Sequence, residues 1–138
     1  MALALYPIVI GLSGLLISSP PAPLLALYCV LPCASPLLDQ AYAGFGKVDV
    51  LVNNAGFGVL GPTSDITDAE MRRQYETNVF GLMAVTRAFL PRMRDRRAGR
   101  IVNVSSVGGR ITLPFFGVYN STKYAVESLS DALRYELR

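Results

Sequence analysis

The stretch Val48-Asp-Val-Leu-Val-Asn-Asn-Ala-Gly56 decides the fold. Its first five residues are apolar except for one aspartate, a pattern typical of a short strand buried in a parallel sheet. The next four residues, Asn53-Asn-Ala-Gly56, form a turn at the carboxyl end of that strand. Open α/β sheets bind their ligands beyond this end of their strands. The stretch therefore predicts a parallel α/β sheet with a ligand site directly after the strand.

A long helix is predicted after this turn. Thr67-Asp-Ala-Glu70 is a capping box, which marks a helix start. Apolar residues then recur at helical spacing between residues 71 and 93, with Met71 and Tyr75 expected on the buried face. Pro91 indicates a bend. Asn78 stands inside this helix, although asparagine is not a favoured residue there.

A second strand and a last helix complete the pattern. Arg100-Ile-Val-Asn-Val104 follows a glycine and predicts a second buried strand. That strand would deliver Ser105 and Ser106 to the same edge of the sheet as the first turn. From Tyr119 a helix is predicted to run to the end of the chain. The polar side chains of three separate segments would then meet at one edge.

Tyr119-Asn-Ser-Thr-Lys123 gives the chain a chemical interpretation. A tyrosine and a lysine four residues apart lie on one face of a helix, one above the other. A free phenol has a pKa near ~10 and exchanges protons poorly at neutral pH. An adjacent ammonium favours the phenolate and makes proton transfer accessible. The pair therefore predicts acid–base chemistry.

The Asn53–Gly56 turn, Asn78, Ser106 and the Tyr119–Lys123 pair occur in an order and at spacings that resemble the short-chain dehydrogenase/reductase family. This family moves hydride between NAD(P) and an alcohol or carbonyl compound. The resemblance covers about residues 39–138. It implies a Rossmann-like, three-layer α/β fold with a parallel sheet, truncated at both ends in this chain. It also implies NAD or NADP as cofactor and a small-molecule alcohol or carbonyl substrate.

The resemblance assigns roles by position. Tyr119 would be the general acid/base, and Lys123 would make the phenol more acidic and bond the nicotinamide ribose. Ser106 would hydrogen-bond the substrate oxygen, and it is preferred to Ser105 because its thirteen-residue distance from the tyrosine fits the family. Asn78 would hold a water that relays protons to the lysine. The residues expected to contact the cofactor are Asn53, Asn54, Ala55, Gly56, Tyr119 and Lys123.

Residues 1–38 do not match the family. They carry no charged side chain and are rich in proline, so we treat them as an atypical apolar segment, separate from the partial Rossmann domain at 39–138. The family places a glycine-rich phosphate loop near its N-terminus. Gly11-Leu-Ser-Gly14 could imitate it, but the next positions that need glycine hold Leu15 and Ile17. The loop is therefore expected to be missing, and the choice between NAD and NADP cannot be predicted.

Two functional hypotheses follow. In the first, the chain is an NAD(P)-dependent oxidoreductase that is incomplete, so that the isolated chain would have little or no turnover. In the second, it is a non-catalytic fragment derived from such an enzyme. That fragment would associate through the helices at 79–97 and 119–137, with itself as a homo-oligomer or with a longer relative.

Composition limits other functions. The chain has no histidine, which removes histidine triads and most zinc or iron sites, and we predict no metal site. The net charge is only +3, and the basic run at 92–100 suits the solvated end of a helix. That run lacks interleaved aromatic residues, so no nucleic-acid partner is expected.

Location and substrate are predicted from apolar segments. A cytoplasmic protein is expected, with membrane association through residues 1–31 as the alternative; no basic flank orients that segment. Leu113, Phe115 and Phe116 follow the serine motif. They would either line a pocket for an apolar alcohol or ketone or anchor their own loop.

Overall fold

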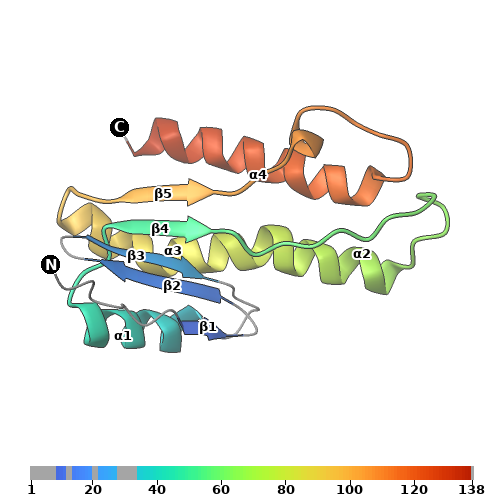
Figure 1. The fold of residues 1–138 in the computed structure, drawn as a ribbon. Coiled ribbons are helices and arrows are strands. Elements are labelled where there is room, and N and C mark those ends of the chain that lie inside the picture. Colours follow the sequence, from blue (N-terminus) through green and yellow to red (C-terminus); the bar gives the residue numbers. More distant parts are fainter. Residues whose placement is uncertain (1–8, 12–13, 20–21, 28–33, 138) are drawn as a thin grey trace, which may run out of the picture.

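The computed structural model describes residues 9–11, 14–19, 22–27 and 34–137, which form an α/β arrangement (Figure 1). The strands are β1 (Val9–Gly11), β2 (Gly14–Ser19), β3 (Ala22–Leu27), β4 (Val50–Asn53) and β5 (Arg100–Asn103). The α-helices are α1 (Ala34–Phe45), α2 (Asp68–Tyr75), α3 (Leu82–Asp95) and α4 (Gly117–Glu136). A π-helix, η1 (Glu76–Gly81), joins α2 to α3, and a 3₁₀ turn, η2 (Val107–Gly109), precedes α4.

The described strands form one sheet in the order β1-β2-β3-β4-β5. β3, β4 and β5 are parallel, whereas β1 and β2 run antiparallel to their neighbours. The parallel pairing predicted for the two later strands is confirmed, and Asn53 stands opposite Asn103 in the register. β3 is a parallel neighbour of β4 that the sequence did not predict. Gly11 pairs with Gly14, so the chain continues there as a β-hairpin and not as a phosphate-binding turn into a helix.

The capping box predicted at Thr67–Glu70 is confirmed, and a glycine directly follows α1. α1 ends before Gly46, whose φ of +69° lies in the left-handed region that glycine tolerates. Thr67 caps α2 by accepting a hydrogen bond from the Glu70 amide, and Glu70 accepts one from the Thr67 amide in return. The long helix departs from α-helical geometry at η1, N-terminal to the predicted bend at Pro91, which lies inside α3.

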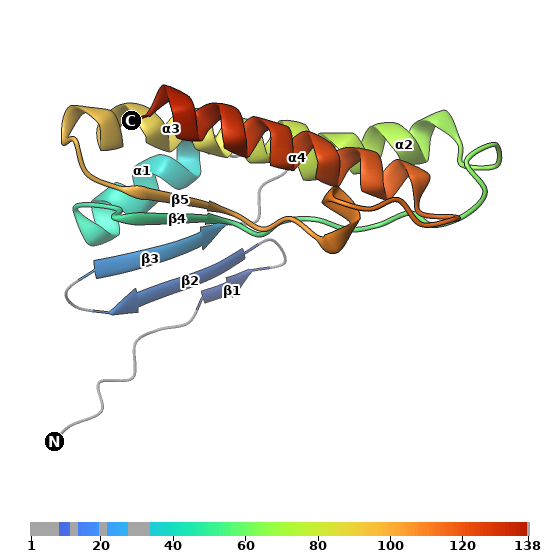
Figure 2. The same cartoon turned by 90° about the horizontal axis from the view of Figure 1, so that it is seen from above.

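The core lies between the sheet and the helices on one of its faces. Helices α1, α3 and α4 all lie on the same side of β4 and β5 (Figure 2). Side chains alternate along a strand, so Leu51 and Ile101 point toward this side. The buried cluster consists of Ala41, Val48, Leu51, Val85, Phe89 and Met93, with Leu38, Tyr42, Ala88 and Ile101 packed against it.

The prediction that residues 100–104 form a buried strand is wrong for the face turned away from the helices. Val102 is 45% exposed, and Val104 is exposed as well. β5 is the outermost strand of the described sheet, and its alternate residues point to the side that the helices do not cover. An apolar run in the sequence does not reveal whether another element covers both faces of its strand.

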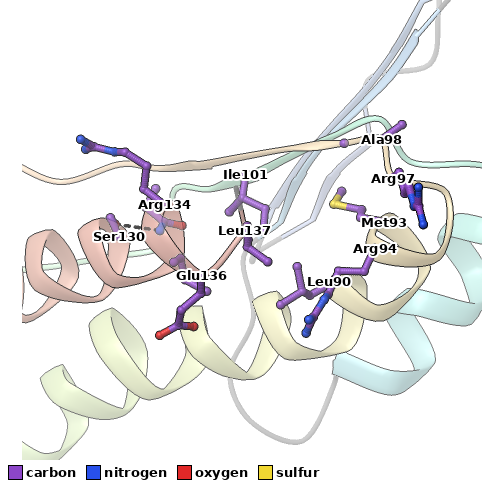
Figure 3. A pocket seen from close by; sticks show the side chains of 13 residues that line it. Leu90, Met93, Arg94, Arg97, Ala98, Ile101, Ser130, Arg134, Glu136 and Leu137 are labelled. Carbon is purple, nitrogen blue, oxygen red and sulfur yellow. Dashed lines mark hydrogen bonds between the residues drawn. The ribbon is translucent and has the colours of Figure 1, made fainter.

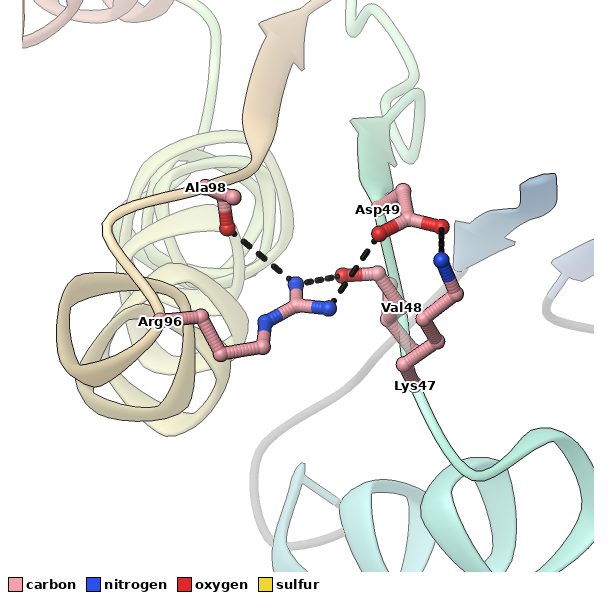
Figure 4. A network of polar contacts seen from close by, with 5 residues as sticks. All are labelled: Lys47, Val48, Asp49, Arg96 and Ala98. Atoms are coloured by element: carbon pink, nitrogen blue, oxygen red, sulfur yellow. Dashed lines mark hydrogen bonds and ion pairs between the residues drawn. The ribbon is translucent and has the colours of Figure 1, made fainter.

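An arginine-centred network fixes the opposite edge of the sheet, where β4 and β5 begin (Figure 4). Arg96 donates to Asp49 Oδ1 at 3.2 Å and to the Val48 carbonyl at 2.6 Å. It also donates to the Ala98 carbonyl at 3.2 Å, and Lys47 forms an ion pair with Asp49 at 3.2 Å. The planar guanidinium thus ties the end of α3 to the start of β4.

A cavity of about 850 Å³ lies between the C-terminal parts of α3 and α4 and the start of β5 (Figure 3). Leu90, Met93, Ile101 and Leu137 contribute apolar surface to it, and Arg94 and Arg97 lie at its border. None of the residues predicted for the catalytic site lines this cavity.

In the part of the chain that the structure describes, no helix has the length and apolar character needed to cross a membrane. The alternative of membrane association rests on residues 1–31, which fall in part outside the described residues. The cytoplasmic location therefore stays a prediction.

Candidate active site

The segments that follow β4 and β5 leave the same edge of the sheet and run toward the first turns of α4 (Figure 1). Buried amides join the elements at this edge. Asn53 donates to Thr86 Oγ1 on α3 at 2.9 Å and to Asn103 Oδ1 on β5 at 2.8 Å. Asn103 in turn donates to Ser130 Oγ on α4 at 2.9 Å. Both hydrogen bonds of the Asn53 side chain go to protein side chains, so the Asn53 amide group joins β4 to β5 and to α3.

Asn78 connects the π-helix to both the turn after β4 and to α4. Its side chain accepts a hydrogen bond from the Phe57 amide at 3.0 Å and donates to the Phe57 carbonyl at 2.9 Å. It also donates to Thr122 Oγ1 at 2.9 Å. The residue is buried, so these bonds satisfy groups that water cannot reach. The helix is π-helical around Asn78, a position where asparagine is not a favoured α-helical residue.

Gly56 ends the turn at a point where a side chain would not fit freely. A Cβ atom there would lie 3.3 Å from Asn78 Oδ1 and 3.4 Å from Lys123 Nζ. The turn, the π-helix and α4 therefore converge on Gly56. Ala55 is partly buried, and Asn54 is exposed to solvent.

Tyr119 and Lys123 stand one helical turn apart on α4, as predicted. Lys123 Nζ lies 5.8 Å from the centroid of the Tyr119 ring and donates to the Val104 carbonyl at 2.9 Å. The lysine is buried, and burial lowers the pKa of its ammonium group below the ordinary value. The positive charge is therefore held close to the phenol ring.

The Tyr119 ring lies against two glycines. A Cβ atom on Gly58 would lie 3.1 Å from Tyr119 Cδ2, and one on Gly108 would lie 3.4 Å from Tyr119 Cε1. The ring also packs edge-on against Phe116, with 6.5 Å between the centroids. Both glycines allow the backbone to approach the ring more closely than a side chain would permit.

Ser106 lies at the start of η2, where its hydroxyl oxygen accepts a hydrogen bond of 3.1 Å from the Gly108 amide. Gly108 is the same residue that approaches the Tyr119 ring. Ser106, Tyr119 and Lys123 are therefore brought to one region, together with Asn78 and Gly56.

The sequence did not single out several residues that build this region. Gln74 is fully buried and accepts a hydrogen bond of 2.5 Å from the Val59 amide, whereas Met71, expected in the core, is 36% exposed. The face of α2 and η1 formed by Gln74 and Asn78 packs on backbone groups of residues 57–59, and these groups need polar partners. The sequence did offer one signal for this face: Gln74 and Asn78 are four residues apart, which places two amide side chains on the same side of a helix.

Asn103 and Thr122 were also missed. Asn103 occupies the place in β5 that Asn53 occupies in β4. An amide directly after the apolar pair Ile101 and Val102 was the sequence signal for this residue. Thr122 lies inside the Tyr119–Lys123 stretch, and its hydroxyl accepts from Asn78 and donates to the Tyr119 carbonyl.

Comparison with known proteins identifies the family. A sequence model described as short chain dehydrogenase matches residues 34–138. The chain belongs to the short-chain dehydrogenase family. Its α/β, Rossmann-like class is thereby confirmed, with a parallel sheet smaller than in full-length members.

Individual relatives agree with this assignment. The chain is 42% identical over 101 residues to an uncharacterized oxidoreductase of Schizosaccharomyces pombe, covering 73% of this chain and 43% of the relative. It is 42% identical over 100 residues to a 3-ketodihydrosphingosine reductase of Bacteroides thetaiotaomicron, covering 72% of this chain and 37% of the relative. This chain therefore spans less than half the length of these curated relatives.

A solved structure gives the same result. A variant of the actinorhodin polyketide ketoreductase, solved with NADPH, superimposes with a TM-score of 0.75 at 36% identity. The alignment covers 77% of this chain and 41% of the ketoreductase. A nicotinamide cofactor is thus bound within the family, and that structure holds it in its reduced, phosphorylated form.

Proposed function

We propose that this chain carries the proton-transfer site of an NAD(P)-dependent oxidoreductase that interconverts an alcohol and a carbonyl compound. One observation supports this most: the Tyr119 ring, the buried Lys123 ammonium and the Ser106 hydroxyl are gathered around Gly108 and the first turns of α4. A phenol, a cation and a hydroxyl in this arrangement suit a general acid/base with a hydrogen-bond partner for the substrate oxygen.

In the direction of reduction, Tyr119 would give its proton to the carbonyl oxygen, while Ser106 holds the same oxygen by a hydrogen bond. The Lys123 ammonium would stabilise the phenolate that Tyr119 becomes. Asn78 would act indirectly, because its amide holds the turn at Phe57 and the α4 residue Thr122 in place. In the direction of oxidation the same groups would take the proton from the alcohol.

The residues present fit part of a nicotinamide nucleotide. When bound, the cofactor would supply or accept the hydride. Lys123 would bond its nicotinamide ribose beside the Tyr119 ring, and residues 53–56 would lie beside its adenosine side. The absence of a side chain at Gly56 leaves room next to Lys123 Nζ. The hairpin of β1 and β2 does not supply a strand–turn–helix cradle for the pyrophosphate, and neither NAD nor NADP is favoured by the described residues.

An apolar substrate is supported by exposed apolar side chains in η2 and in the loop that follows it. Phe115 is 61% exposed, and Leu113, Ile111 and Val107 are exposed as well. These side chains follow Ser106 directly and are free to contact a ligand. Phe116, in contrast, is packed against the Tyr119 ring, which favours an anchoring role for this one residue. The similarity to a 3-ketodihydrosphingosine reductase also supports a ketone substrate.

The test is a calorimetric titration of the purified 138-residue protein with NADH and with NADPH. The proposal expects saturable binding of at least one nucleotide and the same affinity for Tyr119→Phe, since the ring stays in place without its hydroxyl. No binding of either nucleotide would reject the proposal for this chain.

A second candidate function is association without catalysis. It is supported by the exposed apolar side chains of Val102 in β5 and Val104 just after it, and by the hairpin in place of a phosphate loop. The helices at 79–97 and 119–137 would then pair copies of the chain. Sedimentation equilibrium and the nucleotide titration together separate the two functions. This candidate expects dimers in the first measurement and no nucleotide binding in the second.

A further inference from the structure

Glu127 links the segment that carries Ser106 to α4. It follows Lys123 by one helical turn. Its Oε2 lies 2.6 Å from Arg110 Nη2. The buried Ser105 hydroxyl lies on the same side of the helix but makes no hydrogen bond within the described residues. The Ser105 hydroxyl, followed by the charge of Arg110, holds the pKa of Glu127 below its ordinary value of 4.5. The carboxylate is therefore charged at neutral pH and fastens Arg110 to the helix.

Close packing at Gly109 supports the same attachment. A Cβ atom at this position would lie 2.8 Å from Ser105 Oγ, 2.9 Å from Glu127 Cγ and 2.9 Å from the Lys123 carbonyl oxygen. Such distances are too short for any residue with a side chain. The segment therefore lies directly on the α4 backbone between Lys123 and Glu127, and it can do so because residue 109 is glycine.

The two attachments enclose the serine. Ser106 follows Ser105, and its hydroxyl is bonded within η2, the turn that ends just before Arg110. Within η2 and beyond it, the Gly109 amide donates to the Ser106 carbonyl and the Arg110 amide to the Val107 carbonyl, both at 2.9 Å. A displacement at either end would therefore move the Ser106 hydroxyl relative to Tyr119.

We propose that Glu127 is a positioning residue that holds Ser106 against the Tyr119–Lys123 face of α4 through its ion pair with Arg110 and its packing beside Gly109. The catalytic meaning of that position rests on the proposed function, whereas the attachment itself does not. Glu127 would touch neither substrate nor cofactor. Its side chain is 24% exposed, so its ion pair with Arg110 is less screened than a fully solvated ion pair.

The experiment is amide hydrogen exchange, measured residue by residue by NMR on the full 138-residue chain without cofactor. The variants are Glu127→Ala, Arg110→Ala and the charge-exchanged pair Glu127→Arg with Arg110→Glu. Asp131→Asn is the matched control, because it breaks the exposed Asp131–Arg134 ion pair on the same helix without touching the serine segment. Arg110 is 69% exposed, so its removal should not prevent folding even if Glu127→Ala does.

The proposal expects exchange at Gly109, Arg110 and Ile111 to rise by roughly tenfold or more in both alanine variants, and to return toward the wild-type rate in the charge-exchanged pair. Exchange in α3 and in the control should stay unchanged. Unchanged exchange at these three amides in Arg110→Ala would overturn the proposal, as would a charge-exchanged pair that shows no recovery.

Failure of the proposed function is seen separately, because it appears as a lack of nucleotide binding by the wild-type chain. If the wild-type chain does turn over substrate, Glu127→Ala is expected to lower the rate of the chemical step and leave nucleotide affinity unchanged. Loss of nucleotide affinity in Glu127→Ala, with an unchanged rate of the chemical step, would contradict the role of Glu127 in positioning Ser106.

Discussion

Lys123 Nζ donates a hydrogen bond of 2.9 Å to the backbone carbonyl of Val104. Val104 directly follows β5, so this bond ties the helix that carries Tyr119 to the edge of the sheet. It also holds the ammonium group 5.8 Å from the centre of the phenol ring. In the described part of the chain, Lys123 has no carboxylate partner. Its charge is therefore left to act on the phenol or on a ligand.

This buried ammonium predicts a pH-dependent stability. Because burial lowers its pKa, the unfolded chain binds the proton more tightly than the folded chain. The unfavourable contribution is complete below the folded pKa and disappears as the pH rises toward the ordinary value of 10.5. Wild type should therefore gain stability relative to Lys123→Met as the pH rises toward 10.5, measured by urea unfolding at a series of alkaline pH values. A difference that stays constant or reverses would contradict this.

Glu127 predicts the opposite dependence at acidic pH. Its pKa is lowered by the neighbouring Ser105 hydroxyl and then by the charge of Arg110, so its contribution is present above the ordinary value of 4.5 and is lost as the pH falls through the lower folded value. The stability difference between wild type and Glu127→Gln should shrink below pH 4.5. Urea unfolding at a series of pH values checks this, and a difference that grows with acidity would be incompatible with the assigned contacts.

Asn78→Ala should destabilise the fold, because it leaves the Phe57 amide and carbonyl without their buried partner. We expect a loss of about 2–3 kcal/mol in the free energy of unfolding. Asn54→Ala is the matched control, since Asn54 is exposed, and its effect should stay within ~0.5 kcal/mol. Equal effects of the two substitutions in chemical denaturation would argue against the bracing role of Asn78.

Gly108→Ala should distort the site. The added Cβ atom would lie 2.5 Å from Asn120 Oδ1, and Asn120 is buried and cannot swing away. A loss of about 1–3 kcal/mol is expected for such overpacking. Gly44→Ala provides the contrast, because nothing lies within 4 Å of its Cβ position inside α1, and it should stabilise the helix by roughly 0.5–1 kcal/mol. Thermal unfolding of both variants measures these changes. An unchanged stability of Gly108→Ala would show that a glycine is not required at this position.

The features predicted correctly from the sequence depend on neighbouring residues. The capping box at Thr67 and the one-turn spacing of Tyr119 and Lys123 each follow from contacts within one or two turns. The edge of the sheet where the site lies also followed, because consecutive parallel strands end on the same side.

The features that were missed depend on segments far apart in the sequence. Gln74 is buried because the loop at Val59 offers its backbone amide, and Val102 is exposed because no helix lies over that face in the described part. Glu127 acquires its role only through Arg110 and Ser105, which approach it after the chain has folded. A local pattern carries no information about such partners.

The most direct test of the central claim is a single-turnover assay with the protein in excess over NADPH and an apolar ketone, comparing wild type with Tyr119→Phe. An excess of protein reveals even slow chemistry. Because the chain is expected to be incomplete, the account predicts that wild type reduces the ketone only slowly. Tyr119→Phe, with nucleotide affinity unchanged, should do so at least ~100-fold more slowly still. Equal rates in the two proteins would contradict the assignment of Tyr119 as the proton donor.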